Sequence, residues 1–201
     1  MRTLLLAAAL SLSACSPDAP PPPQAAAAPT SEKIKLEDGS GAVVLSLRAR
    51  PDGYKLHGPD DQVIGELKVQ DDRVKLKDEK DLETWKVKRK DYGAEVEAPD
   101  GRRLFKIKKD GDGWKLEDAA EKTLAKAKRK SDGFELRAAD GTTIAKAKSR
   151  DGKVALEAED GTRLRTLDGD ADARAAMWLS MDSFSPGQRA ALWAFFRRVW
   201  K

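Results

Sequence analysis

The sequence predicts a mainly β protein, an antiparallel meander of about 13–14 short strands that is curled or barrel-like. Three observations support this class: a 20-residue unit recurs, apolar and charged residues alternate within it, and turn-forming pairs separate the alternating stretches. Six copies are complete and a seventh is cut short near Asp168. The units begin at Ile34, Tyr54, Val74, Ala94, Trp114, Phe134 and Val154.

The alternation inside one unit indicates two strands. In the first stretch Glu135 stands between Phe134 and Leu136, and in the second Lys146 stands between Ala145 and Ala147. A period of two places the apolar residues on one face of a pleated strand and the charges on the other. Each unit is therefore expected to be a hairpin with one buried face.

An Asp-Gly pair at 140–141 suits a tight two-residue type I′ turn. Such a turn would place Phe134 opposite Ala147 and Leu136 opposite Ala145. Large residues then face small ones across the hairpin, as expected in one packed layer. The turn and the apolar pattern thus predict the same register.

One apolar residue per unit breaks the alternation beside the turn. Two interpretations stay open: a bulge turns this residue inward, or it lies outside under the aliphatic stems of lysines. The row consists of Val44, Ile64, Leu104, Leu124, Ile144 and Leu164.

Residues 171–201 follow the repeat domain (33–170) and predict a helical hairpin. The first helix is expected over residues 171–182. The second starts at Ser185, where Gln188 three residues later gives a capping-box pattern, and runs to about Trp200. Its aromatic face favours packing on or into the curled sheet. Binding of a membrane or a partner is the alternative.

The N-terminal stretch, residues 1–14, has the pattern of an export signal, with Arg2 before a short apolar run. Its end, Leu12-Ser13-Ala14-Cys15, resembles the lipobox of bacterial lipoproteins. This resemblance implies lipidation of Cys15 and cleavage before it. In Gram-negative lipoproteins an Asp directly after the lipidated cysteine commonly signals retention in the inner membrane. Because Ser16 stands there instead, the resemblance implies transfer to the periplasmic face of the outer membrane in a two-membrane host.

Residues 15–32 combine the lipidated Cys15 with a Pro/Ala-rich tether. At about 3.1 Å per residue in extended geometry, the tether could hold the domain up to roughly 50 Å from the membrane. The membrane, reached through Cys15, is therefore an expected partner. A transmembrane barrel is not expected, because the face opposite the apolar one is charged and lipid would have to cover it.

Charge patterning gives one candidate binding surface. The formal net charge is only +4 although 36% of residues are charged, so no nucleic-acid partner is expected. The second strands repeat Lys-x-Lys and would form ladders able to attract an anionic envelope polymer or lipid headgroups. A solvated face that prevents sheet-to-sheet association is the alternative. The ladder comprises Lys86, Lys88, Lys106, Lys108, Lys126, Lys128, Lys146 and Lys148.

Catalytic and metal chemistry find little support. His57 is the only histidine and Cys15 the only cysteine, and neither a phosphate-binding loop nor a G-x-S-x-G elbow occurs. We therefore expect no catalytic residues, metal or cofactor, and place an enzyme behind two other hypotheses. The first is a non-catalytic binding or scaffolding role in the cell envelope. The second is a carrier or sensor of an apolar ligand held inside the curled sheet.

Overall fold

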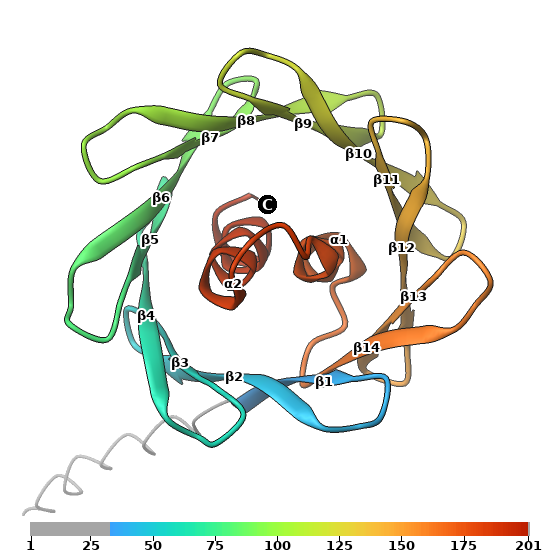
Figure 1. The fold of residues 1–201 in the computed structure, drawn as a ribbon, viewed down its shortest axis with the longest axis horizontal. Coiled ribbons are helices and arrows are strands. Elements are labelled where there is room, and N and C mark those ends of the chain that lie inside the picture. Colours follow the sequence, from blue (N-terminus) through green and yellow to red (C-terminus); the bar gives the residue numbers. More distant parts are fainter. Residues whose placement is uncertain (1–32, 201) are drawn as a thin grey trace, which may run out of the picture. The chain divides into compact units, whose positions relative to one another are not determined.

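Fourteen strands pair in chain order in the computed structural model, which describes residues 33–200, and the sheet closes on itself (Figure 1). The predicted signal, lipidation site and tether lie outside these described residues. The strands are β1 (Lys33–Asp38), β2 (Val43–Arg50), β3 (Gly53–His57), β4 (Val63–Val69), β5 (Arg73–Lys77), β6 (Glu83–Lys90), β7 (Gly93–Glu97), β8 (Arg103–Asp110), β9 (Gly113–Asp118), β10 (Thr123–Lys130), β11 (Gly133–Ala138), β12 (Thr143–Arg150), β13 (Lys153–Glu157) and β14 (Arg163–Asp168).

The barrel is closed by pairing of its first and last strands. β1 and β14 are antiparallel, with Lys35 opposite Asp168 and Leu36 opposite Leu167. Closure removes both open edges, which would otherwise present unpaired backbone groups. The predicted curled meander of hairpin repeats is confirmed, and it is a complete barrel.

The predicted strand register is also confirmed. Phe134 lies opposite Ala147 and Leu136 opposite Ala145. The alternating apolar residues form the buried layer inside the barrel, and the charged residues between them lie on the outer surface. The 20-residue period therefore places equivalent side chains on the same face of every hairpin.

The predicted type I′ turn at 140–141 is wrong. The amide of Ala138 donates to the carbonyl of Thr142 at 2.8 Å, and the amide of Gly141 donates to the carbonyl of Ala138 at 3.0 Å. The turn thus contains three residues, 139–141, and Gly141 takes the left-handed conformation with φ +92°. This matches the common hairpin in which a type I turn is followed by one left-handed residue.

A β-bulge restores the expected register after the longer turn. Ala145 pairs with Leu136 and Thr143 pairs with Arg137, so Ile144 is left without a partner. The same shift recurs in all seven hairpins of residues 33–168. The inward-bulge interpretation of the broken alternation is therefore correct for five of the six residues of the row; Leu164 is also a bulge residue but is not among those packed against the core. Thr84 takes the bulge position in the third hairpin. The bulge residues that pack against the core are Val44, Ile64, Leu104, Leu124 and Ile144.

The C-terminal segment forms two helices, as predicted, and each continues into an irregular turn. Helix α1 (Ala173–Ala176) runs into the 3₁₀ turn η1 (Met177–Ser180), and α2 (Pro186–Ala194) runs into the π-helical turn η2 (Phe195–Val199). The predicted capping box is present. The amide of Gln188 donates to Ser185 Oγ at 3.3 Å, and the Ser185 amide donates to Gln188 Oε1 at 2.9 Å.

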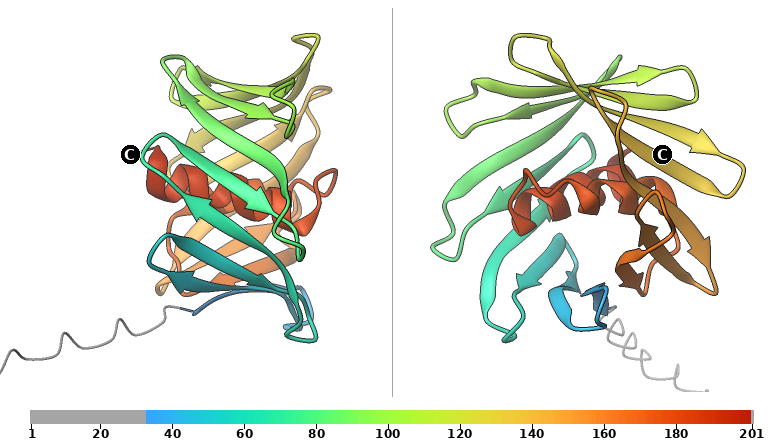
Figure 2. Two further views of the ribbon diagram at one scale, coloured as in Figure 1. Left: turned by 90° about the vertical axis from the view of Figure 1, so that its left-hand side faces the viewer. Right: turned by 45° about the vertical axis from the view of Figure 1, so that its right-hand side comes forward.

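These helices occupy the barrel interior (Figures 1 and 2). α1 and η1 contact β11 and β12, where the small residues Ala145 and Ala147 leave room, and α2 contacts β4, β5 and β6. Trp178 stacks on Phe196 with ring centroids 5.1 Å apart. The barrel is therefore filled by its own C-terminal segment. No helix of residues 33–200 is long and apolar enough to cross a membrane.

A buried polar group fixes this segment to the barrel. Asp170 is 7% exposed and accepts a hydrogen bond from Trp193 Nε1 at 2.8 Å. It also pairs with Arg197 Nε at 3.3 Å, and Arg197 Nη1 donates to the Tyr54 hydroxyl at 2.9 Å. This network joins the end of β14 to α2, η2 and β3.

Candidate functional site

The eight ladder lysines lie on the outer face of β6, β8, β10 and β12, as expected from their spacing. Trp85 and Val87 are buried in the interior, so Lys86 and Lys88 between and after them point outward. Every other strand of this half of the barrel thus contributes a pair of lysines. What these lysines can bind depends on how far their charges are already compensated.

Glutamates at outward positions of the intervening strands compensate much of this charge. Glu117 on β9 is typical: its side chain is only 3% exposed because lysine stems cover it. Lys115 Nζ lies 2.7 Å from its carboxylate and Lys108 Nζ 2.9 Å. The hydrogen bond from Lys115, followed by that from Lys108, holds the pKa of Glu117 below its usual range even though burial opposes this shift.

The same arrangement recurs around the ladder. Five of the eight ladder lysines pair with a glutamate, and in four of these pairs the carboxylate is buried or nearly so, so most ladder charges are already compensated within the barrel. Such pairs contribute little net charge for an external ligand. The contacts are Lys86 and Lys88 with Glu97 at 3.2 and 3.0 Å, Lys106 with Glu121 at 3.4 Å, Lys108 with Glu117 at 2.9 Å, Lys148 with Glu157 at 3.0 Å, and Lys146 with the Glu159 carbonyl at 3.0 Å.

Strand β10 is the exception. Lys126 and Lys128 are the two exposed members of the ladder, and neither has an ion-pair partner within residues 33–200. Lys126 lies directly opposite Lys115 on β9 and Arg137 on β11. Like charges facing each other across strands destabilise a sheet. In the row Lys115–Lys126–Arg137, which we call the β10 row, Lys115 and Arg137 pair with Glu117 and Glu135 at 2.7 and 3.0 Å, so the charge of Lys126 is the one left without an ion pair within residues 33–200.

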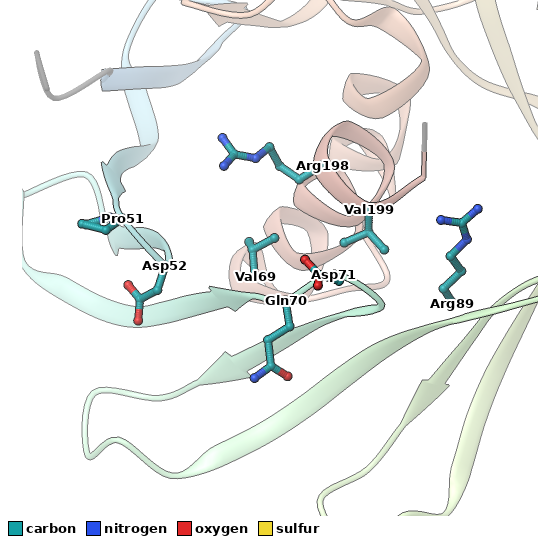
Figure 3. A pocket seen from close by; sticks show the side chains of 8 residues that line it. All are labelled: Pro51, Asp52, Val69, Gln70, Asp71, Arg89, Arg198 and Val199. Atoms are coloured by element: carbon teal, nitrogen blue, oxygen red, sulfur yellow. The ribbon is translucent and has the colours of Figure 1, made fainter.

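The two mouths of the barrel differ. At the Lys33 mouth, β1 begins and short turns join successive units; at the bulge mouth lie the three-residue turns and the bulges. A cavity of about 630 Å³ opens at the Lys33 mouth (Figure 3). It is lined by Pro51, Asp52, Val69, Gln70, Asp71, Arg89, Arg198 and Val199.

The charges of this cavity do not converge. Arg89 and Arg198 lie on opposite sides of Val199 and their guanidinium groups point apart (Figure 3). Asp52 and Asp71 bring carboxylates to the same lining. The cavity is an open polar trough of mixed charge rather than a focused site for an anion or a cation.

At the bulge mouth the structure reveals charged residues that sequence reasoning missed. Arg165 Nη2 lies 2.6 Å from Asp182 Oδ1, and Arg189 Nη1 lies 2.8 Å from the same oxygen. Burial, followed by the charge of Arg165, holds the pKa of Arg189 below its usual range. The sequence does contain a sign that Arg165 is unusual, because it is the one charged residue at its position in the 20-residue unit. The other units carry Leu45, Gly65, Trp85, Phe105, Ala125 and Ala145 there.

His57 has a structural role. Its side chain is buried, and Nδ1 donates a hydrogen bond to the carbonyl oxygen of Asp61 at 2.8 Å, which ties β3 to the following turn. Within residues 33–200 no three histidine, cysteine, aspartate or glutamate side chains gather in a group that could hold a metal ion.

Two features of the outer face and the bulge mouth carry positive charge in excess: the exposed Lys126 and Lys128 on β10, which have no ion pair within residues 33–200, and the arginine pair that shares Asp182. No protein-family model matches the chain, and no curated protein matches it.

Proposed function

We propose that this protein is a lipid-anchored envelope protein with a non-catalytic binding and scaffolding role. In this proposal Cys15 carries the lipid at the periplasmic face of the outer membrane, and the barrel binds an anionic envelope polymer through β10. The observation that carries the proposal is the exposed pair Lys126 and Lys128 on β10, which have no ion-pair partner within residues 33–200, with Lys126 flanked by the cations Lys115 and Arg137.

The filled interior supports a scaffold rather than a carrier of an internal ligand. Trp178, Trp193 and Phe196 take up the space that an apolar cargo would need, and all three are at most 1% exposed. Releasing them would expose a large apolar surface to water, which is costly. The barrel therefore acts as a rigid body that presents its outer surface.

The spacing of the β10 row suits a polymer. Neighbouring strands lie about 4.8 Å apart, so three cations on three adjacent strands form a closely spaced line across the barrel wall. A chain of carboxylate or phosphate groups crossing the strands could meet each cation in turn. Exposed Lys128 on the same strand adds a fourth positive charge beside this line.

Charge reversal tests the polymer site. In the full chain carrying Cys15→Ser, which removes the lipid contribution, the double variant Lys126→Glu/Lys128→Glu should bind dextran sulfate about tenfold more weakly, equivalent to about 1.4 kcal/mol. The matched control is Lys35→Glu/Lys55→Glu, which changes the same charge on β1 and β3 at least five strands away and breaks no ion pair within residues 33–200.

The control variant should bind dextran sulfate nearly as well as the parent, after allowance for its lower net charge. Equal loss in both double variants would show only a general charge effect and would contradict a β10 site. Vesicles of equimolar phosphatidylethanolamine and phosphatidylglycerol provide the other arm. Binding to these vesicles without binding to dextran sulfate would replace the polymer by lipid headgroups.

The anchor is tested separately. Mass spectrometry of the mature protein should find a lipid-modified Cys15 at its N-terminus, and Cys15→Ser should move the protein from the membrane fraction to the soluble fraction. An unmodified Cys15 in the membrane-bound wild-type protein would overturn the proposed anchor without affecting the β10 argument.

A further inference from the structure

A second cavity, of about 530 Å³, opens at the bulge mouth and differs in character from the polar trough at the other end. It lies between β8, β10 and β12 on one side and the segment 181–188 on the other. Six of its side chains are apolar, and two polar side chains complete it. The lining residues are Leu104, Phe105, Leu124, Ile144, Met181, Ser183, Phe184 and Gln188.

The repeat itself explains why this cavity forms. Leu104, Leu124 and Ile144 are bulge residues, so each turns toward the mouth instead of outward. Phe105 packs edge-on against Phe184 with ring centroids 5.1 Å apart and forms an aromatic wall. The next hairpins carry alanine where this one carries Phe105, so no large side chain fills the adjoining space.

Charged residues are the chain neighbours of three residues that line the cavity. Asp182 lies between the lining residues Met181 and Ser183, and Arg189 follows the lining residue Gln188. Asp182 is shared by two guanidinium groups, those of Arg165 and Arg189, at 2.6 and 2.8 Å. Arg189 Nε is buried and has no hydrogen-bond partner within residues 33–200. One exposed carboxylate thus faces two partly buried cations, which leaves an excess of positive charge.

We infer that the bulge mouth binds a single-chain anionic amphiphile, with the aliphatic chain in the 530 Å³ cavity and a carboxylate or phosphate group at Arg165 and Arg189. Cavities that hold small ligands measure about 300–1,000 Å³ and combine apolar walls with a few polar groups. Guanidinium groups recognise carboxylates and phosphates through strong charge-assisted hydrogen bonds. The ligand's head group competes with Asp182 for these donors. The site uses neither the β10 row nor the barrel interior.

Dodecanoate, titrated calorimetrically into the full chain carrying Cys15→Ser, tests the cavity. Ser183 is exposed and lines the cavity, so Ser183→Trp should fill it and weaken dodecanoate binding at least about tenfold. Ser40→Trp is the matched control, because Ser40 is an exposed turn residue at the same mouth on the β1–β2 turn, away from β8–β12. This control should bind dodecanoate like the parent.

A gain of affinity tests the head-group site and cannot arise from misfolding. Asp182→Asn removes the competing carboxylate, so it should tighten dodecanoate binding several-fold and leave dodecanol binding unchanged. Dodecyl phosphate in parallel with dodecanoate identifies which head group is preferred. The inference is overturned if dodecanoate fails to bind, if Ser183→Trp binds it as the parent does, or if Asp182→Asn weakens it.

Discussion

Asp170 is expected to be the residue on which retention of the helices inside the barrel depends most. It follows the last strand, is buried, and accepts from Trp193 Nε1 at 2.8 Å while pairing with Arg197 at 3.3 Å. It also accepts from the Asp172 amide at 3.1 Å, close to the start of α1. Asp170→Ala should therefore loosen both helices at once.

The magnitude follows from what the substitution leaves behind. The Trp193 indole N–H stays in the core without an acceptor, which costs about 1–3 kcal/mol. Arg197 keeps its bond to Tyr54 but loses its contact with Asp170, and removing one partner of a buried ion pair costs about 3–5 kcal/mol in fully buried cases. Because the Arg197 side chain is 21% exposed, we expect about 3–4 kcal/mol in total. Asp170→Asn keeps an acceptor and should cost about half as much.

Urea unfolding of the full chain, followed by tryptophan fluorescence, measures these losses. A double-mutant cycle with Trp193→Phe isolates the hydrogen bond, because the phenylalanine has no N–H to leave unsatisfied. The cycle should give a coupling energy of about 1–2 kcal/mol. Additive losses, or a loss below about 1 kcal/mol for Asp170→Ala, would show that packing alone holds the helices and that the polar network is incidental.

Three further predictions concern the repeat. Gly141→Ala should lower the free energy of unfolding by about 1 kcal/mol, because φ is +92° but nothing lies within 4 Å of the new Cβ. Gly133→Ala should lower it far more, because its Cβ would meet a backbone carbonyl oxygen at 1.9 Å, and thermal melts that rank the two variants in reverse would contradict the turn geometry. Lysine hydrogen bonds lower the pKa of Glu117 from 4.5, so the ionised carboxylate stabilises the folded state above pH 4.5, and this contribution is lost as the pH falls through the lower folded pKa. The difference in unfolding free energy between wild type and Glu117→Gln should therefore close on acidification, and a difference independent of pH would refute this prediction. Ala147→Trp should overpack the interior and lower the free energy of unfolding by about 1–3 kcal/mol or more, while Lys146→Thr on the outer face should change the melting temperature little. Equal shifts in melting temperature for the two variants would mean that the inner and outer faces are misassigned.

The strands and their faces could be predicted because both are local properties of each unit. Phe134 and Ala147 are 13 residues apart in the chain, and one hairpin decides their pairing. Closure of the barrel, in contrast, is not a local property of one unit. The pairing of Leu36 with Leu167 has no local signal, since it depends on the number of strands and on what fills the interior.

The sequence pattern mispredicts the turn for a physical reason. Asp-Gly favours positive φ, but only the last residue of each three-residue turn needs it, and Asp61, Asp81 and Glu121 take that conformation without being glycine. The broken alternation at Ile144 was the better signal, because a bulge and a longer turn compensate each other in register.

The candidate site could be predicted only in outline. The lysine positions follow from the period, but their charge balance depends on which strand carries a glutamate opposite them. Lys126 stands out only once the structure shows that it faces a cation on each side and has no ion-pair partner within residues 33–200. The pair of Arg165 and Arg189 required the path of the chain between the two helices, which no spacing in the sequence reports.

The filled interior sets the number of repeats that the barrel can have. One additional 20-residue unit would add two strands, and barrel diameter grows roughly in proportion to strand number. A helix has a fixed diameter of about 10–12 Å with its side chains, so the same C-terminal segment would no longer touch the wall all around. Duplication or loss of a hairpin is the easiest change for a repeated sequence to undergo. Here the two helices fit the interior of a barrel of seven hairpins and would leave empty space inside a barrel of eight.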